Sequence, residues 1–271
     1  MPELPEVETV RTNLEPVLAG RRFDRVEILD PRLVRPYEPA AVAAELEGER
    51  VASVERRGKY LIVRFESGLA LLVHLRMTGG FPKAPASHER AVLTLDDGAR
   101  VSYRDVRRFG TWAVHDRAAA EAYLAGRLGP EPLGPDFTRA FLRKRLAGRT
   151  APVKAAILDQ RVVAGLGNIY ADESLWRARL HPRRPAGTLT TGELDRLHRG
   201  IRAALERGIA TEGADLGDGV YASGSMQDEF HVYGRGGEPC DRCGTPIAKT
   251  RVAGRGTWFC PRCQPEVRPR P

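Results

Sequence analysis

The sequence predicts an α+β chain of several domains, in which antiparallel strands come first, helices follow and a small cysteine hairpin comes last. Short apolar runs of strand type fill the stretch from about residue 22 to 116, apolar residues recur at helical spacing after residue 137, and every cysteine lies beyond residue 239. At 271 residues the chain is long enough for about two domains and for a substantial core.

The chain begins with MPELPEVE, which combines a helix start with residues that a helix does not need. Pro5 suits a first helical turn, and Val7 and Val10 mark a face that a fold would bury. An ordinary helix start accounts for these residues. It leaves Pro2 beside Glu3, at the free end of the chain, without an explanation.

Pro2 has a chemical use once Met1 is removed, which a small second residue normally permits, because it then carries a terminal secondary amine. An α-amino group has a pKa of about 7.7–8.0, so roughly 30% of it is neutral near pH 7.5. Attack by this amine on a carbonyl carbon gives a charged iminium, which acidifies the adjacent C–H and promotes elimination. Glu3 could carry the protons that such a reaction needs.

The strand region predicts an antiparallel sandwich or barrel. The runs KYLIVRF and LALLVHLR are rich in large apolar and β-branched residues, and Asp97-Gly98 lies between two alternating runs, as in a tight hairpin. The segment 126–137, GRLGPEPLGPDF, predicts a linker. In the helical part, Thr190 and Glu193 have the spacing of a capping box, and residues 212–225 predict a loop.

The cysteines form two CxxC pairs separated by 16 residues, namely Cys240, Cys243, Cys260 and Cys263. This spacing predicts one structural zinc ion with four thiolate ligands and no open coordination position. Two disulfide bonds are the alternative, which the expected absence of a signal peptide disfavours. The hairpin between the pairs carries Arg255 on its arm, where it would suit a phosphate.

The net charge of +8 and the pI of about 9.6 favour a polyanionic partner, and nucleic acid is the first candidate. A bias of the whole sequence toward arginine is the alternative, since only five of the 43 basic residues are lysines. Neither a basic start followed by an apolar run nor an 18-residue apolar stretch is present in the sequence, so we expect a cytoplasmic protein without a membrane partner.

Taken together, several motifs resemble the formamidopyrimidine-DNA glycosylases of the bacterial Fpg/Nei family, from one end of the chain to the other. They are PELPEVE at the N-terminus, RRGKYL at 56–61, HLRMTG at 74–79, RRFG at 107–110, GLGNIYADE at 165–173 and the four-cysteine hairpin. The resemblance implies a bifunctional base-excision repair enzyme, a DNA glycosylase and AP lyase. It would remove 8-oxoguanine and formamidopyrimidines from damaged double-stranded DNA and then cut the strand by β,δ-elimination.

The resemblance also implies an architecture. An N-terminal β-sandwich with flanking helices would span residues 1–125. A linker would follow at 126–137. A domain with a helix–two-turn–helix motif would span residues 138–232, and it would include a lid over the lesion at about 213–227. The zinc finger would span residues 233–271. We expect one zinc ion, neither Mg²⁺ nor an organic cofactor, and a monomer in the bacterial cytoplasm that associates with the nucleoid.

The implied catalytic residues begin at the N-terminus. Pro2 would attack the sugar C1′, and Glu3 would help to open the sugar ring. Lys59 would hold a phosphate and protonate a leaving group, although a plain strand lysine is the alternative. Glu6 and Lys154 would support the cationic intermediate and the lesion pocket.

The implied DNA contacts fall into two groups. Met77 and Phe109 would fill the space that a flipped base leaves, and Arg107 would bond the orphaned cytosine. By residue type alone, Met77 and Phe109 would be core residues, and Val106 stands where the family often has proline.

The second group would bind phosphates. It consists of Asn168, Arg255 and, with a weaker claim, His74. The alternative role of Asn168 is the cap of the helix that follows the tight turn at Gly165 and Gly167.

Two rival functions remain at this point. The related endonuclease VIII-type enzymes share the nucleophile and the finger but remove oxidised pyrimidines; Leu4 and the set Met77, Arg107 and Phe109 favour the purine branch. A non-catalytic zinc-ribbon protein would explain the charge and the cysteines, but it would leave Pro2 and Glu3 without a purpose.

Overall fold

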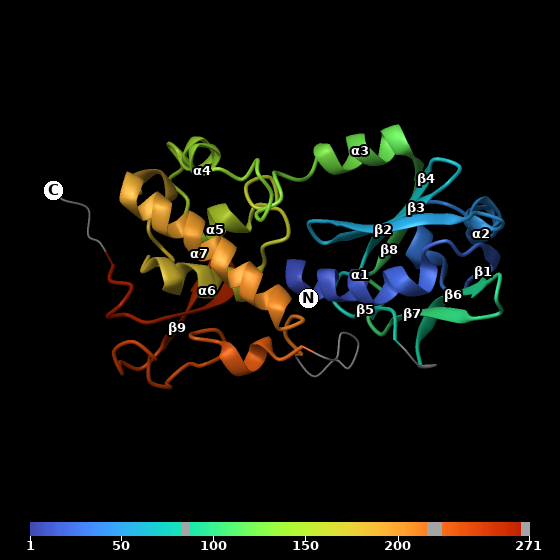
Figure 1. Cartoon of the computed structure of the whole chain (residues 1–271). Helices are drawn as coiled ribbons and strands as arrows, with labels where there is room; N and C mark the ends of the chain where they lie inside the picture. Colours follow the sequence, from blue (N-terminus) through green and yellow to red (C-terminus); the bar gives the residue numbers. More distant parts are fainter. Residues whose placement is uncertain (83–86, 216–223, 267–271) are drawn as a thin grey trace. The chain divides into compact units, whose positions relative to one another are not determined.

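The computed structural model describes residues 1–82, 87–215 and 224–266, and the chain divides into two compact units (Figure 1). Unit 1 comprises residues 1–126 and 212–224, and unit 2 comprises 127–211 and 225–271. The predicted helical and cysteine-rich segments therefore share one unit. Residues 216–223 of the predicted lid lie outside the described residues.

Unit 1 contains two four-stranded antiparallel sheets, which confirms the predicted sheet domain. One sheet has the order β2 (Val51–Arg57), β3 (Tyr60–Phe65), β4 (Leu69–His74) and β8 (Thr111–Asp116). The other has the order β1 (Phe23–Ile28), β6 (Glu89–Leu95), β7 (Arg100–Asp105) and β5 (Gly79–Gly80). Val63 of the first sheet and Leu93 of the second belong to the same buried core, as a sandwich requires.

Two local predictions in unit 1 are confirmed. Asp97 and Gly98 form the turn between β6 and β7, where Gly98 has a φ of +81° that favours glycine. The first helix, α1 (Leu4–Leu18), buries Val7 and Val10 in the core of the sandwich. The other helices of this unit are α2 (Pro39–Leu46), α3 (Arg117–Ala125) and the short 3₁₀ turn η1 (Pro31–Val34).

Unit 2 is built on helices. They are α4 (Arg139–Leu146), α5 (Val153–Leu158), α6 (Asn168–Ala178) and α7 (Thr191–Ala210), with 3₁₀ turns η2 (Ala186–Thr188) and η3 (Met226–Glu229). α7 begins with the predicted capping box of Thr190 and Glu193. It packs closely on α6 at Gly200, where a Cβ atom would lie 2.7 Å from the carbonyl oxygen of Ser174.

The implied helix–two-turn–helix motif is present as α5, two turns and α6. Gln160 holds the turns from inside, because its Oε1 accepts from the Gly165 N–H at 2.9 Å and its Nε2 donates to the Leu166 carbonyl at 2.9 Å. The cysteine segment adds the hairpin of β9 (Ala248–Val252) and β10 (Arg255–Phe259). Among the described residues no helix combines the length and hydropathy needed to cross a membrane.

Candidate functional site

The N-terminal residues are buried directly before the first turn of α1. Pro2 is buried, Glu3 is 2% exposed and Glu6 is 3% exposed. Both oxygens of the Glu6 carboxylate accept hydrogen bonds from backbone N–H groups. Oε2 accepts from the Glu3 N–H at 2.7 Å, and Oε1 accepts from the Ala214 N–H at 2.9 Å. Glu6 therefore fixes the backbone at Glu3 and joins it to the segment that follows α7.

Gly213 is necessary for this arrangement. Its φ is +80°, and a Cβ atom there would lie 2.9 Å from the Cγ atom of Glu6. A side chain at this position would therefore strain the backbone and displace the carboxylate that holds the N-terminus. The support of a cationic intermediate that the resemblance implies for Glu6 stays a prediction, and its bond to Ala214 has no signal in the sequence.

Lys59 lies in the turn between β2 and β3 and is 5% exposed, so it is not the plain strand lysine of the alternative interpretation. The preceding Gly58 has a positive φ of 57°. Arg56 links this turn to α1: its Nε donates to Glu8 at 2.7 Å, and its Nη1 donates to the Gly58 carbonyl at 3.1 Å. The turn is thus held against α1, the helix that begins next to the N-terminus.

The Glu8 carboxylate that receives Arg56 is charged. Burial alone would raise the pKa of Glu8, but the hydrogen bonds from Arg56 and Arg11 lower it below its usual value. The anchor between α1 and the turn at Lys59 is therefore an ion pair at neutral pH.

His74, the last residue of β4, is 8% exposed and packs edge-on against the Tyr60 ring at 4.7 Å between centroids. Burial, together with the charges of Arg76 and Lys59, lowers the pKa of His74 to about 3. Its Nδ1 accepts a hydrogen bond from the Arg76 N–H at 3.0 Å. The neutral ring therefore carries its proton on Nε2, and it can offer a phosphate a hydrogen bond but no charge.

The predicted wedge residues lie on or beside the loop at 105–110. Phe109 is 52% exposed and Arg107 is exposed, so Phe109 is not a core residue, whereas Met77 is half-buried. The guanidinium carbon of Arg107 lies 4.9 Å from the centroid of the Phe109 ring. A large aromatic side chain left in solvent beside a cation is the arrangement that an inserted wedge requires.

Two buried carboxylates hold this loop. Asp105, 1% exposed, accepts from the Gly110 N–H at 2.7 Å and from the Arg107 N–H at 3.2 Å. The Asp30 carboxylate, 3% exposed, accepts two hydrogen bonds from Arg108, one from Nε and one from Nη2, the latter at 2.9 Å. The hydrogen bond from Arg108 lowers the pKa of Asp30, so this two-pronged ion pair between Arg108 and Asp30, called the fork below, stays charged. Sequence reasoning missed both carboxylates.

Asn168 bonds the carbonyl group of the residue that follows Arg255 in unit 2. Gly167 is the N-cap of α6 and Asn168 is its first residue, which corrects the alternative in which Asn168 caps the helix. The Nδ2 atom of Asn168 donates instead to the carbonyl of Gly256 at 3.0 Å. Exposed Arg255 precedes that glycine, so this hydrogen bond ties the backbone next to Arg255 to the start of α6.

Lys154 is fully enclosed in unit 2. Its ammonium lies 2.8 Å from the Oδ1 atom of Asp172 and donates to the Gly256 carbonyl at 2.9 Å and to the Thr257 hydroxyl at 2.8 Å. Burial raises the pKa of Asp172 to about 7, against the opposing charge of Lys154. These contacts hold the same carbonyl that Asn168 holds; a role of Lys154 near the lesion stays a prediction.

The four cysteine sulfur atoms lie within 4.8 Å of one another, and the Sγ of Cys243 is 3.5 Å from those of Cys260 and Cys263. A tetrahedral zinc ion with Zn–S bonds of about 2.3 Å needs sulfur atoms about 3.8 Å apart. The cluster fits one zinc ion, and its thiols are free, which removes the disulfide alternative.

Comparison with known families accounts for most of the chain. The model of the formamidopyrimidine-DNA glycosylase N-terminal domain matches residues 1–112, that of the formamidopyrimidine-DNA glycosylase H2TH domain matches 128–218, and that of a zinc finger found in FPG and IleRS matches 237–265. The three models follow one another in the order of the sheet domain, the helical motif and the cysteine hairpin.

Individual relatives are similar over nearly their whole length. The formamidopyrimidine-DNA glycosylase of Symbiobacterium thermophilum is 51% identical over 98% of this chain and 90% of that protein. The formamidopyrimidine-DNA glycosylase of Geobacillus kaustophilus is 46% identical over 97% of this chain and all of that protein. The crystal structure of the MutM (Fpg) protein of Thermus thermophilus has a TM-score of 0.89 at 43% identity and covers 98% of this chain and all of that one.

Lactococcus lactis Fpg has been solved in complex with DNA containing an abasic site, with a TM-score of 0.91, 38% identity and coverage of 97% of this chain and all of that one. The same enzyme has been solved with DNA containing Fapy-dG and with DNA containing an oxidised pyrimidine. The family models match the residues that form the N-terminal helix, the helical motif and the cysteine cluster, and this chain belongs to the formamidopyrimidine-DNA glycosylase family.

Proposed function

We propose that this protein is a bifunctional DNA glycosylase and AP lyase, which removes oxidised purines from duplex DNA in base-excision repair. The observation that carries the proposal is the buried Pro2-Glu3 end, fixed by Glu6 at the start of α1, in a chain of this family. The proposed substrates are 8-oxoguanine and formamidopyrimidines, and the proposed place of action is the bacterial cytoplasm, in association with the nucleoid. The protein acts as a monomer.

The chemistry follows from the terminal amine. After removal of Met1, the nitrogen of Pro2 forms a bond to C1′ as the damaged base leaves, and Glu3 delivers a proton to the ring oxygen as the sugar opens. The resulting iminium withdraws electrons from C2′, and loss of a C2′ proton expels the 3′ phosphate. A second elimination expels the 5′ phosphate, and hydrolysis then returns the free amine.

The remaining residues act on the DNA. Lys59, enclosed in its turn, supplies a positive charge near the phosphate and a proton for a leaving group, while neutral His74 donates one hydrogen bond. Asn168 and Arg255 bind a phosphate together at the start of α6. Met77 and Phe109 occupy the space left by the extruded base, and Arg107 pairs with the orphaned cytosine.

Borohydride reduction during the reaction tests the function. We expect the protein to be trapped on duplexes that contain 8-oxoguanine opposite cytosine or an abasic site, and peptide mapping should place the adduct on Pro2. A chain that keeps Met1 is the control: its Pro2 nitrogen is an amide, so no adduct should form. A Pro2→Gly variant should retain a primary amine and show a weaker lyase step.

The same experiment separates the rival functions. The Lactococcus lactis structure with an oxidised pyrimidine justifies including a thymine glycol duplex. Faster trapping on thymine glycol than on 8-oxoguanine would move the protein to the endonuclease VIII-type group. Binding of all duplexes without an adduct on any of them would instead indicate a non-catalytic zinc-ribbon protein.

The loop at 105–110 gives a prediction about binding. Asp30→Asn removes the charged fork that holds Arg108, so Arg107 and Phe109 lose their fixed direction. We expect affinity for a duplex with a stable abasic analogue to fall by about 3–10-fold, the range for one partly exposed ion pair with a positioning role. Fluorescence anisotropy at one salt concentration measures it.

Asp24→Asn is the matched control for this variant. Asp24, on β1, also pairs with an arginine, Arg22 at 3.0 Å, but its side chain is 44% exposed and holds no loop of the proposed DNA contacts. Affinity should be unchanged in this control. An Asp30→Asn protein that binds like the wild type, or equal losses in both variants, would contradict a positioning role for the fork.

A further inference from the structure

The first CxxC pair of the zinc site rests on the end of α6 through Trp176. This tryptophan is 4% exposed and its Nε1–H group points to the Sγ atom of Cys240, at 3.5 Å. Cys240 is itself 3% exposed. An N–H donor at this distance is within range of a hydrogen bond to sulfur, so the indole can hold the Cys240 sulfur in the position of a metal ligand.

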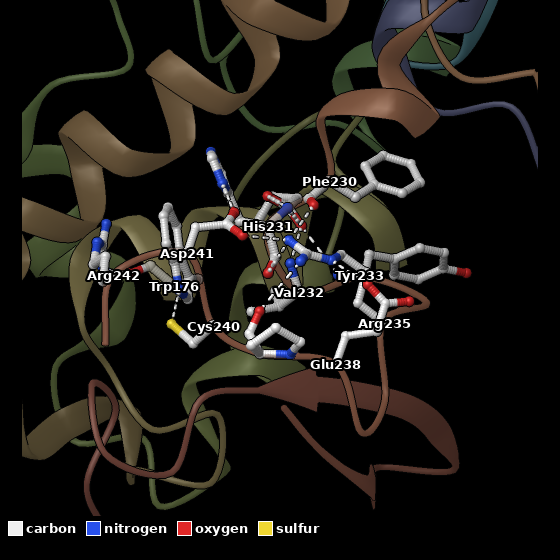
Figure 2. A network of polar contacts seen from close by, with 12 residues as sticks. Trp176, Phe230, His231, Val232, Tyr233, Arg235, Glu238, Cys240, Asp241 and Arg242 are labelled. Carbon is white, nitrogen blue, oxygen red and sulfur yellow. Dashed lines mark hydrogen bonds and ion pairs between the residues drawn. The ribbon is translucent and has the colours of Figure 1, made fainter. Parts of the chain in front are cut away.

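Contacts on the indole ring fix the direction of its N–H group. The guanidinium carbon of Arg242 lies 3.5 Å from the ring centroid, and Arg242 also donates to the Trp176 carbonyl at 2.6 Å. The His231 ring stacks on the indole, with 4.0 Å between centroids and 16° between planes. Figure 2 shows these side chains gathered around Trp176. Such stacking removes the freedom of the indole to rotate away from the sulfur.

Both residues inside the first CxxC pair take part in this cluster. Arg242 stacks as described, and the Asp241 carboxylate accepts from Arg235 at 2.8 Å and lies 2.7 Å from the Nδ1 atom of His231. The backbone that carries Cys240 and its neighbours is therefore held by side chains from outside the pair. A metal hairpin with a small core of its own needs such external support.

Glu173 fixes the other side of the cluster. It is fully buried on α6, and its carboxylate accepts from the N–H groups of His231 at 3.1 Å, Val232 at 2.9 Å and Tyr233 at 3.0 Å. Three backbone donors on one carboxylate form a strong anchor. The position of the stacked His231 ring is thus set by the same helix that carries Trp176.

We propose that Trp176 is a positioning residue for the zinc ligand Cys240, and that α6 aligns the metal site with the phosphate-binding hairpin. The same helix reaches β10 at two further points: Asp172 accepts from the Trp258 N–H at 3.1 Å, and Asn168 holds the Gly256 carbonyl. The link to phosphate rests on the proposed function. The effect on zinc does not.

Trp176→Phe tests the proposal, because it keeps an aromatic ring for stacking and removes the N–H donor together with the pyrrole part of the indole, a loss of volume that the control below shares. Zinc affinity, measured by competition with a chromogenic chelator, should fall by about 10-fold, the lower end for loss of a group that supports a metal ligand. Release of zinc to excess chelator should be faster. Circular dichroism and the melting temperature of the zinc-loaded protein check that the variant is folded.

Trp258→Phe is the matched control, since its half-buried indole packs against the Tyr233 ring at 4.7 Å on the same hairpin. Its zinc affinity should equal that of the wild type. Unchanged zinc affinity in Trp176→Phe, or an equal loss in Trp258→Phe, would overturn the proposal. A wild-type protein that failed to bind a lesion duplex would overturn the proposed function and leave the zinc result intact.

A measurement on the unmutated chain covers the case in which Trp176→Phe does not fold. With NMR-active cadmium in place of zinc, the indole N–H proton of Trp176 should show scalar coupling to the metal through the sulfur of Cys240. The indole protons of Trp112 and Trp258 should show none. A well-resolved Trp176 signal without coupling would contradict the hydrogen bond.

Discussion

Replacement of Glu3 by glutamine is expected to abolish base excision while DNA binding is retained. Glutamine keeps the size of the side chain and an acceptor oxygen, but it cannot deliver the proton that opens the sugar ring. General acid–base groups contribute about 10²–10⁴-fold to rates, so single-turnover excision of 8-oxoguanine should slow by that factor. Anisotropy with a stable abasic analogue should show an affinity close to that of the wild type.

The surroundings of Glu3 make this a specific test. The residue is 2% exposed and its N–H group is held by Glu6, so the variant keeps the backbone that positions the chain end. Glu15→Gln is the control: Glu15 lies on the same helix in an ion pair with Arg11, and its side chain is 44% exposed. A Glu3→Gln enzyme with full excision activity would refute the assignment.

Loss of one zinc ligand is expected to have the second large effect. Cys260 is fully buried, and Cys260→Ser leaves three thiolates for the metal. Structural zinc contributes about 10–16 kcal/mol to the folding of isolated fingers, so the hairpin should lose its fixed form without it. Arg255 and the Gly256 carbonyl that orients Asn168 lie on that hairpin.

We expect Cys260→Ser to weaken binding of a lesion duplex by roughly 10²–10⁴-fold, from two charge-assisted phosphate contacts worth about 1.5–3 kcal/mol each. Anisotropy and metal analysis measure the two losses together. Wild-type protein stripped of zinc should behave in the same way and recover when zinc is returned, whereas the variant should not recover. A zinc-free variant that binds DNA like the wild type would contradict this role of the finger.

The parts of the site that sequence predicts well depend on neighbours in the chain. The CxxC spacing, the start of α1 with Pro5 in its first turn and the turn at Asp97-Gly98 each follow from short-range geometry. The site residues Pro2, Glu3 and Lys59 were assigned partly by chemistry and partly by resemblance to a family. Residue type alone was misleading for Phe109, because its hydrophobicity indicates burial while its loop leaves it 52% exposed.

Apart from Asp105, which holds its own loop, the residues that sequence reasoning missed act over long separations in the chain. Asp30 holds Arg108, Glu173 holds the backbone at 231–233, and Trp176 reaches Cys240. One signal was present: GLGNIYADE places two adjacent carboxylates, Asp172 and Glu173, on a helix whose other faces are largely apolar. A buried acidic pair needs donors, but nothing in the local pattern identifies which donors.

The sequence by itself determined the order of the sheet, helical and cysteine segments and the four metal-binding cysteines, and it supplied the proposal for the chain end, because spacing and functional-group chemistry are local properties. Only the tertiary structure decided which charges are buried and what they bind. Lys154 illustrates the difference: the resemblance implies a place near the lesion, and only the fold shows that its ammonium is enclosed beside Asp172. The cost of burying a charge depends on every group packed around it, and those groups come from distant parts of the chain.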